Sequence, residues 1–351
     1  MQPVRILILG TGGMAKNHAE HFAAIPGVTL VAGIDTRAEQ LAAFQKAHNI
    51  PNGFASVQDA IAWGEFDAVT NVTPDAAHYA TTLPFLAAGK HVLCEKPLAT
   101  NAAHATEMAA AAAKADVVNM VNLTYRNVPA LQKAAAMVRD GAIGTIRHFE
   151  ASYLQSWLTQ PAWGHWDKES QWLWRLSTKH GSKGVLGDVG IHILDFATFI
   201  AGMDATQISC LLQTFDKAPG GQIGEYVLDA NDSATMQVRL SNGALGTVAA
   251  TRFASGHLND LRLRLYGLTG GLEMRFEKGE SHLRACLGED INTGTWHDVD
   301  CPAVPTVYQR FIAAIRGKGP AEPDFARGAA LQVLLDKAEA SAGQDGKLLA
   351  V

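Results

Sequence analysis

Short apolar runs alternate with longer amphipathic segments through the first third of the chain. The runs have the length of buried strands and the segments between them the length of helices. The expected strands are Val4–Leu9, Val28–Ile34, Phe66–Val72, His91–Cys94 and Val117–Leu123. The expected helices are Lys16–Ile25, Arg37–His48, Ala76–Ala88 and Asn101–Ala115. Strands that alternate with helices predict an α/β domain with a doubly wound parallel sheet.

The pattern changes after about residue 123, where strands follow one another without helices between them. The expected strands are Arg147–Tyr153, Gln207–Thr214, Ser233–Leu240, Leu245–Phe253, Asp260–Tyr266 and Gly271–Phe276. Asn242-Gly243 and Gly270-Gly271 are predicted to be hairpin turns. Two late helices are expected near Thr306–Arg316 and Phe325–Ala342. This half is therefore predicted to be an α+β domain with a large, open, mainly antiparallel sheet.

The first strand runs directly into a G-x-G-x-x-A motif that opens a helix. Gly10 permits the tight turn, Gly12 lets the backbone approach a pyrophosphate, and Ala15 allows close packing of helix on strand. Asp35 ends the second strand, at the spacing expected of a carboxylate that binds an adenosine ribose diol. The carboxylate repels a 2′-phosphate, which favours NAD, but Arg37 offers a partner for such a phosphate and NADP stays open.

The glycine motif and the change of pattern near residue 123 together predict two domains with different functions. We expect a dinucleotide-binding Rossmann domain over residues 1–122 and a substrate-binding and oligomerisation domain over residues 123–351. The length of 351 residues agrees with two domains, because single hydrophobic cores stop growing beyond about 250–300 residues.

Glu95-Lys96-Pro97 follows the apolar strand His91–Cys94. Proline cannot donate to a sheet ladder and ends the strand there. Lys96 is therefore expected at the carboxyl end of a parallel strand, where open α/β sheets bind their ligands. The alternative is a surface turn with a solvated lysine.

Asp188 and His192 lie four residues apart in a predicted helix, within side-chain reach on one face. A carboxylate beside an imidazole fixes its tautomer and makes it a better proton acceptor. The alternative is an acidic first turn followed by a buried structural histidine. Asp195 is expected to be structural. No metal site is expected, because these residues are too few to complete a ligand set.

These residues together resemble the Gfo/Idh/MocA family (glucose–fructose oxidoreductase and inositol dehydrogenase) over nearly the whole chain. Its A-G-K-H-V-x-x-E-K-P motif is matched by residues 88–97, and a G-G-x-x-x-D-x-G-x-H-x-x-D-like element by residues 184–195. Ser182-Lys183 departs from the glycine run that is frequent there. The resemblance implies that Lys96, Asp188 and His192 are catalytic. It implies cofactor binding by Gly10, Gly12, Gly13, Met14, Asp35, Arg37, Thr73, Pro74, His78, Glu95, Lys96, Asn122 and Arg126.

Five of the seven tryptophans lie between residues 157 and 174. Indole faces stack on the C–H faces of sugars, but tryptophan is also common in packed loops and subunit contacts, and both readings stay open. With the resemblance, the expected substrate is a sugar, glycoside or cyclic polyol. Its predicted binding residues are Lys96, Trp163, Trp174, Arg175, Asp188 and His192.

The predicted reaction is hydride transfer between a ring secondary alcohol and NAD(P). His192, oriented by Asp188, is the expected base, and Lys96 holds the substrate oxygen or shares the proton transfer. Two other functions stay open on the same fold. One is an NAD-requiring glycoside hydrolase that acts through transient oxidation, and the other is a non-catalytic sugar sensor.

Charge and composition exclude other classes of partner. The chain has 29 basic and 34 acidic residues without a basic stripe, so no nucleic acid is expected. No apolar run is long enough to span a membrane, no signal peptide is recognised, and four scattered cysteines read as reduced thiols, which predicts a cytoplasmic protein. Apolar positions in the second half predict a homodimer or homotetramer through the sheet, at Leu245, Val248, Leu263 and Leu265.

Overall fold

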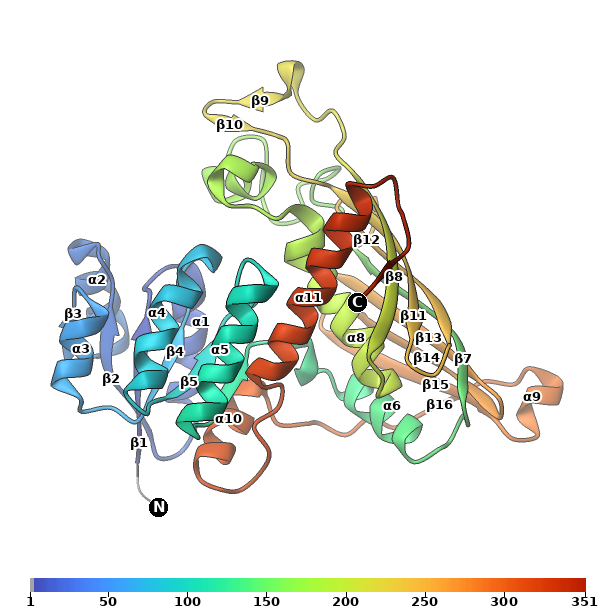
Figure 1. The fold of residues 1–351 in the computed structure, drawn as a ribbon, viewed down its shortest axis with the longest axis horizontal. Coiled ribbons are helices and arrows are strands. Elements are labelled where there is room, and N and C mark those ends of the chain that lie inside the picture. Colours follow the sequence, from blue (N-terminus) through green and yellow to red (C-terminus); the bar gives the residue numbers. More distant parts are fainter. Residues whose placement is uncertain (1–2) are drawn as a thin grey trace. The chain divides into compact units, whose positions relative to one another are not determined.

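The computed structural model describes residues 3–351, which form two compact units (Figure 1). Unit 1 contains the chain up to Thr124 together with residues 305–332, and unit 2 contains residues 125–304 and 333–351. The division differs from the predicted boundary at residue 122 mainly in one respect. A late segment returns to the N-terminal unit, so each unit is built from two stretches of chain.

Unit 1 is built on a parallel sheet with the strand order β3-β2-β1-β4-β5-β6, which confirms the predicted doubly wound sheet. Its strands are β1 (Val4–Leu9), β2 (Val28–Ile34), β3 (Asn52–Phe54), β4 (Ala68–Asn71), β5 (His91–Cys94) and β6 (Asn119–Val121). Its first five helices are α1 (Gly13–Ala23), α2 (Ala38–His48), α3 (Val57–Trp63), α4 (Asp75–Ala87) and α5 (Ala102–Ala115). The pattern missed β3 and α3, because both are short and weakly apolar.

The late segment of unit 1 completes its core. Thr306 and Gln309 form a capping box that begins α10 (Val307–Ile315). Four residues of this helix are buried in the same apolar cluster as Phe22 of α1 and the strands of the sheet: Val307, Tyr308, Phe311 and Ile312. The predicted helix α11 (Phe325–Ala342) follows, and its residues up to Gln332 belong to unit 1.

Unit 2 carries a nine-stranded sheet with the order β16-β15-β14-β13-β7-β12-β11-β8-β17. Its strands are β7 (Ile146–Leu154), β8 (Ala205–Gln213), β11 (Ser233–Leu240), β12 (Leu245–Thr251), β13 (Asp260–Gly267), β14 (Gly270–Glu277), β15 (Glu280–Leu287), β16 (His297–Asp298) and β17 (Leu349–Ala350). β9 (Gln222–Ile223) and β10 (Tyr226–Val227) pair separately. Only β7 and β12 pair in parallel among the described strands of the large sheet, so the prediction of a mainly antiparallel sheet is confirmed.

The predicted hairpin turn at Gly270-Gly271 is wrong by two residues. Leu268 and Thr269 form the turn, and both glycines begin β14. Glycine is needed there for packing: a Cβ at Gly270 would meet the Cys286 carbonyl oxygen at 2.8 Å, and one at Gly271 would meet the Trp296 ring at 3.0 Å.

One face of the large sheet packs against α6 (Pro129–Arg139) and α8 (Ile191–Ala201). Val248, Leu263 and Leu265 are buried, whereas Leu245 is 47% exposed. Three of the four residues expected on the free face therefore belong to the core of unit 2, because strand alternation points them inward. Unit 2 also contains the short helices α7 (Ser170–Leu173) and α9 (Asp290–Thr293) and the end of α11 from residue 333 onward.

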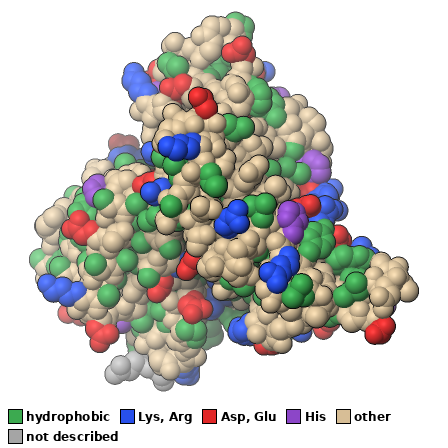
Figure 2. Space-filling model, turned by 45° about the vertical axis from the view of Figure 1, so that its right-hand side comes forward, with side chains coloured by type: hydrophobic (Ala, Val, Ile, Leu, Met, Phe, Trp, Pro, Cys, Tyr) green, Lys and Arg blue, Asp and Glu red, His purple; other side chains and the backbone are tan. Residues whose placement is uncertain are grey.

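Charged side chains of both signs are interspersed over the face drawn in Figure 2. None of the helices within residues 3–351 combines the length and hydropathy that crossing a bilayer requires.

Candidate functional site

The glycine motif of unit 1 forms a tight turn with open space above it. Gly10 has φ +88°, and a Cβ there would meet the Val72 carbonyl oxygen at 3.0 Å. A Cβ at Gly12 or Gly13 would meet nothing within 4 Å. Gly13 begins α1, so its first backbone N–H groups face a space that a pyrophosphate can approach. Met14 follows with an exposed side chain.

Asp35 lies directly after β2 and is bonded to the glycine motif. Its Oδ2 accepts from the backbone N–H and the hydroxyl of Thr11, at 3.0 and 2.7 Å. Its Oδ1 accepts from the backbone N–H and Nε of Arg37, at 2.9 and 3.1 Å. Burial opposes ionisation, but the hydrogen bonds from Arg37 and Thr11 outweigh it and hold the pKa of Asp35 well below its usual range. The carboxylate is therefore charged where the ribose of a dinucleotide is expected.

His78 ties together the two loops that follow β4 and β5. Its ring nitrogens lie 2.9 Å from the Thr73 carbonyl oxygen and 2.8 Å from the Pro97 carbonyl oxygen. Both partners only accept, so both nitrogens carry a proton. Burial alone would lower the pKa of His78, but Cys94 and Asp75 raise it to about 10. His78 is buried, and its two hydrogen bonds hold the Thr73-Pro74 segment to the Lys96-Pro97 segment.

Glu95 is the centre of a buried network beside Lys96. Its Oε1 accepts from His18 Nε2 at 2.8 Å and from Asn122 Nδ2 at 2.7 Å, and its Oε2 accepts from the Lys96 backbone N–H at 3.1 Å. Burial opposes the charge of Glu95, but His18 and Asn122 lower its pKa to about 2. Asn122 also donates to Tyr308 of α10, at 3.0 Å. The network fixes the backbone at Lys96, which lies at the carboxyl edge of the parallel sheet.

Asn122 offers a further point of attachment in unit 1. Its side chain is completely buried, and its Oδ1 has no hydrogen-bond partner in the structure. A buried amide oxygen without a partner carries a free-energy cost that a donor group would remove. The open glycine turn, the charged Asp35 and this acceptor together fit a dinucleotide.

Asp188 and His192 of unit 2 lie on two different kinds of helical turn. Leu186–Gly190 is a π-helical turn, and α8 continues from it. The wider turn changes the four-residue geometry that the sequence predicted, and such turns are frequent at functional sites. His192 is buried, and its ring and the Tyr125 ring form a T-shaped pair with a centroid distance of 4.9 Å.

The carboxylate of Asp188 is held by Arg252, which sequence reasoning missed. Arg252 Nη2 donates to Asp188 Oδ2 at 3.0 Å, and Arg252 Nη1 donates to the Arg175 carbonyl oxygen at 3.1 Å. The guanidinium is fully buried and lies 5.0 Å from the centre of the Trp157 ring. A signal was present in the sequence, because Arg252 directly follows β12 and continues the alternation of its inward residues Val248 and Ala250, where an arginine requires a partner.

Arg126, which was expected to bind the cofactor, lies in unit 2 and bonds to a residue of α8. Its guanidinium makes two hydrogen bonds with Asp195, at 2.6 and 2.8 Å, and covers the Phe199 ring at 3.4 Å. Both charged groups are buried. The pair explains Asp195 as a structural carboxylate, in agreement with the sequence, and gives Arg126 a structural role that the resemblance did not imply.

The tryptophan-rich segment divides into a core and an exposed part. Trp157 and Trp172 belong to a small apolar cluster with Leu173 and Leu176. In contrast, Trp163 and Trp174 are 37% and 38% exposed. The Arg175 guanidinium lies 4.6 Å from the centre of the Trp174 ring. Packing therefore accounts for part of the segment and leaves two indoles accessible.

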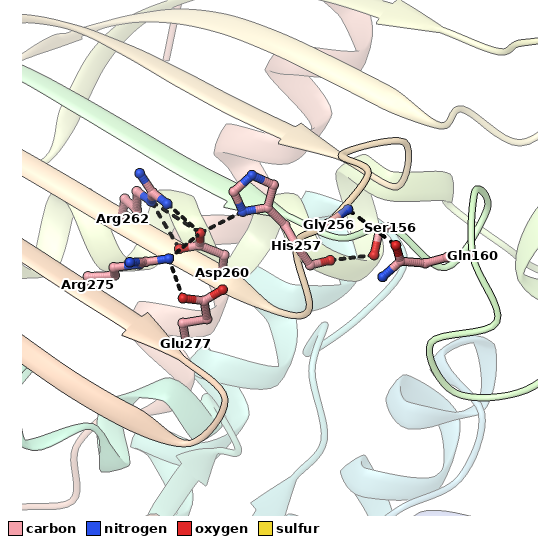
Figure 3. Close-up of polar contacts among 8 residues, drawn as sticks. All are labelled: Ser156, Gln160, Gly256, His257, Asp260, Arg262, Arg275 and Glu277. Atoms are coloured by element: carbon pink, nitrogen blue, oxygen red, sulfur yellow. Dashed lines mark hydrogen bonds and ion pairs between the residues drawn. The ribbon is translucent and has the colours of Figure 1, made fainter.

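A cluster of potential metal ligands lies at the start of β13 and the end of β14. Ligand atoms of His257, Asp260 and Glu277 lie within 4.8 Å of one another. Arg262 and Arg275 both donate to the Asp260 carboxylate, as Figure 3 shows. These guanidinium groups supply the positive charge that a cation would bring, so the cluster is an ion-pair network.

Comparison with known proteins identifies both units. Residues 4–123 match the oxidoreductase family with an NAD-binding Rossmann fold, and residues 131–273 match the GFO/IDH/MocA C-terminal domain. The chain is 26% identical to levoglucosan dehydrogenase of Pseudarthrobacter phenanthrenivorans, over 98% of this chain and 97% of that protein. It is 30% identical to D-glucoside 3-dehydrogenase of Escherichia coli, over 69% of this chain and 68% of that protein.

Solved structures agree with the sequence matches. The structure of levoglucosan dehydrogenase in complex with NADH and levoglucosan superposes with a TM-score of 0.86 and 25% identity, and the match covers 100% of both chains. The predicted fold class and the resemblance are confirmed. The chain belongs to the Gfo/Idh/MocA family of NAD-binding oxidoreductases.

Proposed function

We propose that the protein is an NAD(P)-dependent dehydrogenase of a ring secondary alcohol in a sugar, glycoside or cyclic polyol. The observation that carries the proposal is a buried His192 in the helical segment that follows Asp188, whose carboxylate is held by the buried Arg252. A histidine in this setting has the proton-accepting chemistry that oxidation of an alcohol requires. The named relatives, which are dehydrogenases of levoglucosan and of D-glucosides, support the substrate class.

His192 is the proposed base, and Asp188 and Arg252 are the groups that orient it. The chemistry that NAD supplies when bound is acceptance of a hydride from the alcohol carbon. Removal of the hydroxyl proton then falls to His192. Lys96 is proposed to hold the substrate oxygen with its ammonium group, since the Glu95 network fixes its backbone at the edge of the sheet.

NAD is the proposed cofactor, held by the glycine turn, Asp35 and Asn122. Asp35 remains charged and repels a 2′-phosphate, which supports NAD. Arg37 has a mostly exposed side chain that a 2′-phosphate can reach, so NADP is proposed as the weaker alternative. The proposed contacts of Thr73, Pro74 and Met14 with the cofactor rest on the family resemblance.

Trp163, Trp174 and Arg175 are the proposed sugar-binding residues outside the catalytic group. The exposure of the Trp163 and Trp174 side chains supports this assignment, because the other indoles of the segment pack in an apolar cluster. An exposed indole with an arginine over one face still offers its other face and its edge to a sugar ring.

We also propose a homodimer or homotetramer in the cytoplasm. The outward face of the sheet carries exposed Leu211 on β8 and Leu245 on β12, both aligned with the same face of β11. All four cysteines are free thiols, which supports a reducing compartment.

A screen of sugars, glycosides and polyols tests the function. Reduction of NAD is followed by absorbance, and release of the aglycone is measured in parallel. Oxidation of a sugar by the wild type but not by His192→Ala supports the proposal. His282→Ala, a change to an exposed histidine of the same unit, is the matched control. Aglycone release without net NADH would favour a hydrolase, and absence of both reactions with every compound would refute the proposal.

A further inference from the structure

A chain of hydrogen bonds in unit 2 begins at Trp157. The indole N–H can only donate, so the Gln155 atom that lies 3.1 Å away is the amide oxygen. The amide nitrogen of Gln155 therefore faces Asn259, and the Asn259 atom at 2.7 Å from it is an oxygen. The indole thus sets the orientation of two successive amides.

The same logic sets the direction of two tyrosine hydroxyls. Tyr153 Oη lies 2.8 Å from Asn259 Oδ1, which only accepts, so Tyr153 donates its proton there. Tyr125 makes a short hydrogen bond to Tyr153, and it must be the donor because the Tyr153 proton is already in use. The Tyr125 oxygen is left with lone pairs and no proton to offer.

An ionic anchor holds Asn259 in place. Asn259 has φ +48°, a left-handed conformation at the end of the loop before β13. The next residue, Asp260, is fully buried and binds His257, Arg262 and Arg275 at 2.8, 2.8 and 3.3 Å (Figure 3). These three partners of Asp260 hold the backbone of the turn, and the bonds from Gln155 and Tyr153 hold the Asn259 amide oxygen in place.

The end of the chain of hydrogen bonds lies beside the candidate base. The Tyr125 ring stands at 87° to the His192 ring, with 4.9 Å between the centroids. Burial raises the pKa of Tyr125 to about 12, the hydrogen bond between Tyr125 and Tyr153 opposes that shift, and the charge of Asp188 adds to it. Tyr125 is therefore a neutral phenol near neutral pH, with its proton directed toward Tyr153.

We infer that Tyr125 determines substrate specificity as a hydrogen-bond acceptor. Its oxygen accepts a hydrogen bond from a second substrate hydroxyl, on the carbon next to the one that is oxidised. The inference rests on the proposed function and narrows its substrate class to vicinal diols. Gauche neighbouring hydroxyls of a sugar ring lie within hydrogen-bonding distance of each other, and the Tyr125 and His192 rings are in contact. We therefore expect an alcohol bound at His192 to bring its neighbouring hydroxyl near Tyr125. Substrates that lack this hydrogen, through deoxygenation or O-alkylation, are rejected.

The test uses a sugar found in the screen and two analogues for each ring hydroxyl. A deoxy analogue removes the group, and a deoxyfluoro analogue replaces it with an atom that cannot donate. At one position, we expect both analogues to lose about tenfold to a hundredfold in kcat/KM with the wild type. In Tyr125→Phe, the natural sugar and both analogues should differ by less than about threefold.

Tyr153→Phe tests the direction of the hydrogen bond between Tyr125 and Tyr153. Without its acceptor, the Tyr125 hydroxyl is free to donate, so the deoxyfluoro analogue should become a better substrate than the deoxy analogue. Tyr266→Phe, which changes a tyrosine at the end of β13, is the matched control and should keep the wild-type discrimination.

Two outcomes would overturn the inference while the proposed function stands. One is a wild-type enzyme that accepts the deoxyfluoro analogue and rejects the deoxy analogue at the sensitive position, since Tyr125 would then be a donor. The other is a Tyr125→Phe variant with unchanged discrimination. If no sugar or polyol is oxidised at all, the proposed function fails, and the inference fails with it.

Discussion

Arg252 reaches Asp188 across 3.0 Å from a position sixty-four residues further along the chain. Arg252 is completely buried, whereas the Asp188 side chain is 30% exposed. The pair therefore has one end in the core and the other at an accessible surface. Such a partner fixes the direction of the carboxylate, and through it the histidine that Asp188 is proposed to orient.

Arg252→Met should lower both stability and turnover, because it preserves much of the volume and removes the charge. Loss of one partner of a buried ion pair costs about 3–5 kcal/mol, and partial exposure of Asp188 places the expected loss at the lower end. Asp188→Asn in the same chain should recover more than about 1 kcal/mol, since the uncompensated charge is gone. Urea unfolding of the two single variants and the double variant measures the coupling. Additive losses would contradict it.

His192→Ala should lower kcat by about 10²–10⁴-fold and leave NAD affinity nearly unchanged, because general-base catalysis typically contributes that much. Lys96→Ala should lower kcat and also weaken NAD binding, since Lys96 follows the Glu95 network of unit 1. Steady-state kinetics and cofactor titration of both variants separate the two roles. If His192→Ala keeps near wild-type turnover at every pH, Lys96 becomes the leading base.

Asp35→Ala should weaken NAD binding by about tenfold to a hundredfold, which corresponds to the loss of charge-assisted hydrogen bonds. The change also releases Arg37 from its bonds at 3.1 Å, so NADP should bind better. Titration of both cofactors gives the affinity ratio, with Arg37→Ala as a comparison that should selectively weaken NADP. An unchanged ratio in Asp35→Ala would refute the assignment.

Stability should fall at acid pH through Glu95. Its pKa is lowered from 4.5 to about 2 in the folded protein, so its contribution is present above pH 4.5 and is lost as pH falls toward 2. At one pKa unit per 1.36 kcal/mol, the contribution reaches up to about 3 kcal/mol. Glu95→Gln should be less stable at pH 7 and show a flatter acid dependence in urea unfolding. The same dependence in both proteins would show that Glu95 is not the group responsible.

Elements with a strong local pattern were predictable from sequence. The strands Val4–Leu9 and His91–Cys94 appear with the predicted bounds, and the Asn242-Gly243 turn lies between β11 and β12 as expected. β15 was not predicted, because Glu280, His282 and Arg284 alternate with Ser281, Leu283 and Ala285, of which only the leucine is strongly apolar. Helix α6 was also not predicted, although Pro129 in its first turn is a recognised signal for the start of a helix.

The candidate site was predictable only where a residue type carries its own chemistry. The glycine motif and Lys96 follow strands, so their places at the sheet edge could be read from sequence. The direction of the Tyr125 hydroxyl depends on residues up to 134 positions away, and no local pattern reports it. Partners of this kind are set by tertiary packing alone.

Completion of unit 1 has a consequence for how the protein is made. Tyr308 contacts His21 and Phe22, and α10 supplies four buried residues to the core that surrounds β1. A ribosome must therefore synthesise all of unit 2 up to residue 304 before the first unit can close its core. A chain released early would carry the glycine turn on an incomplete scaffold, which cellular proteases can recognise. The cofactor-binding unit matures only in chains that already possess the proposed catalytic histidine.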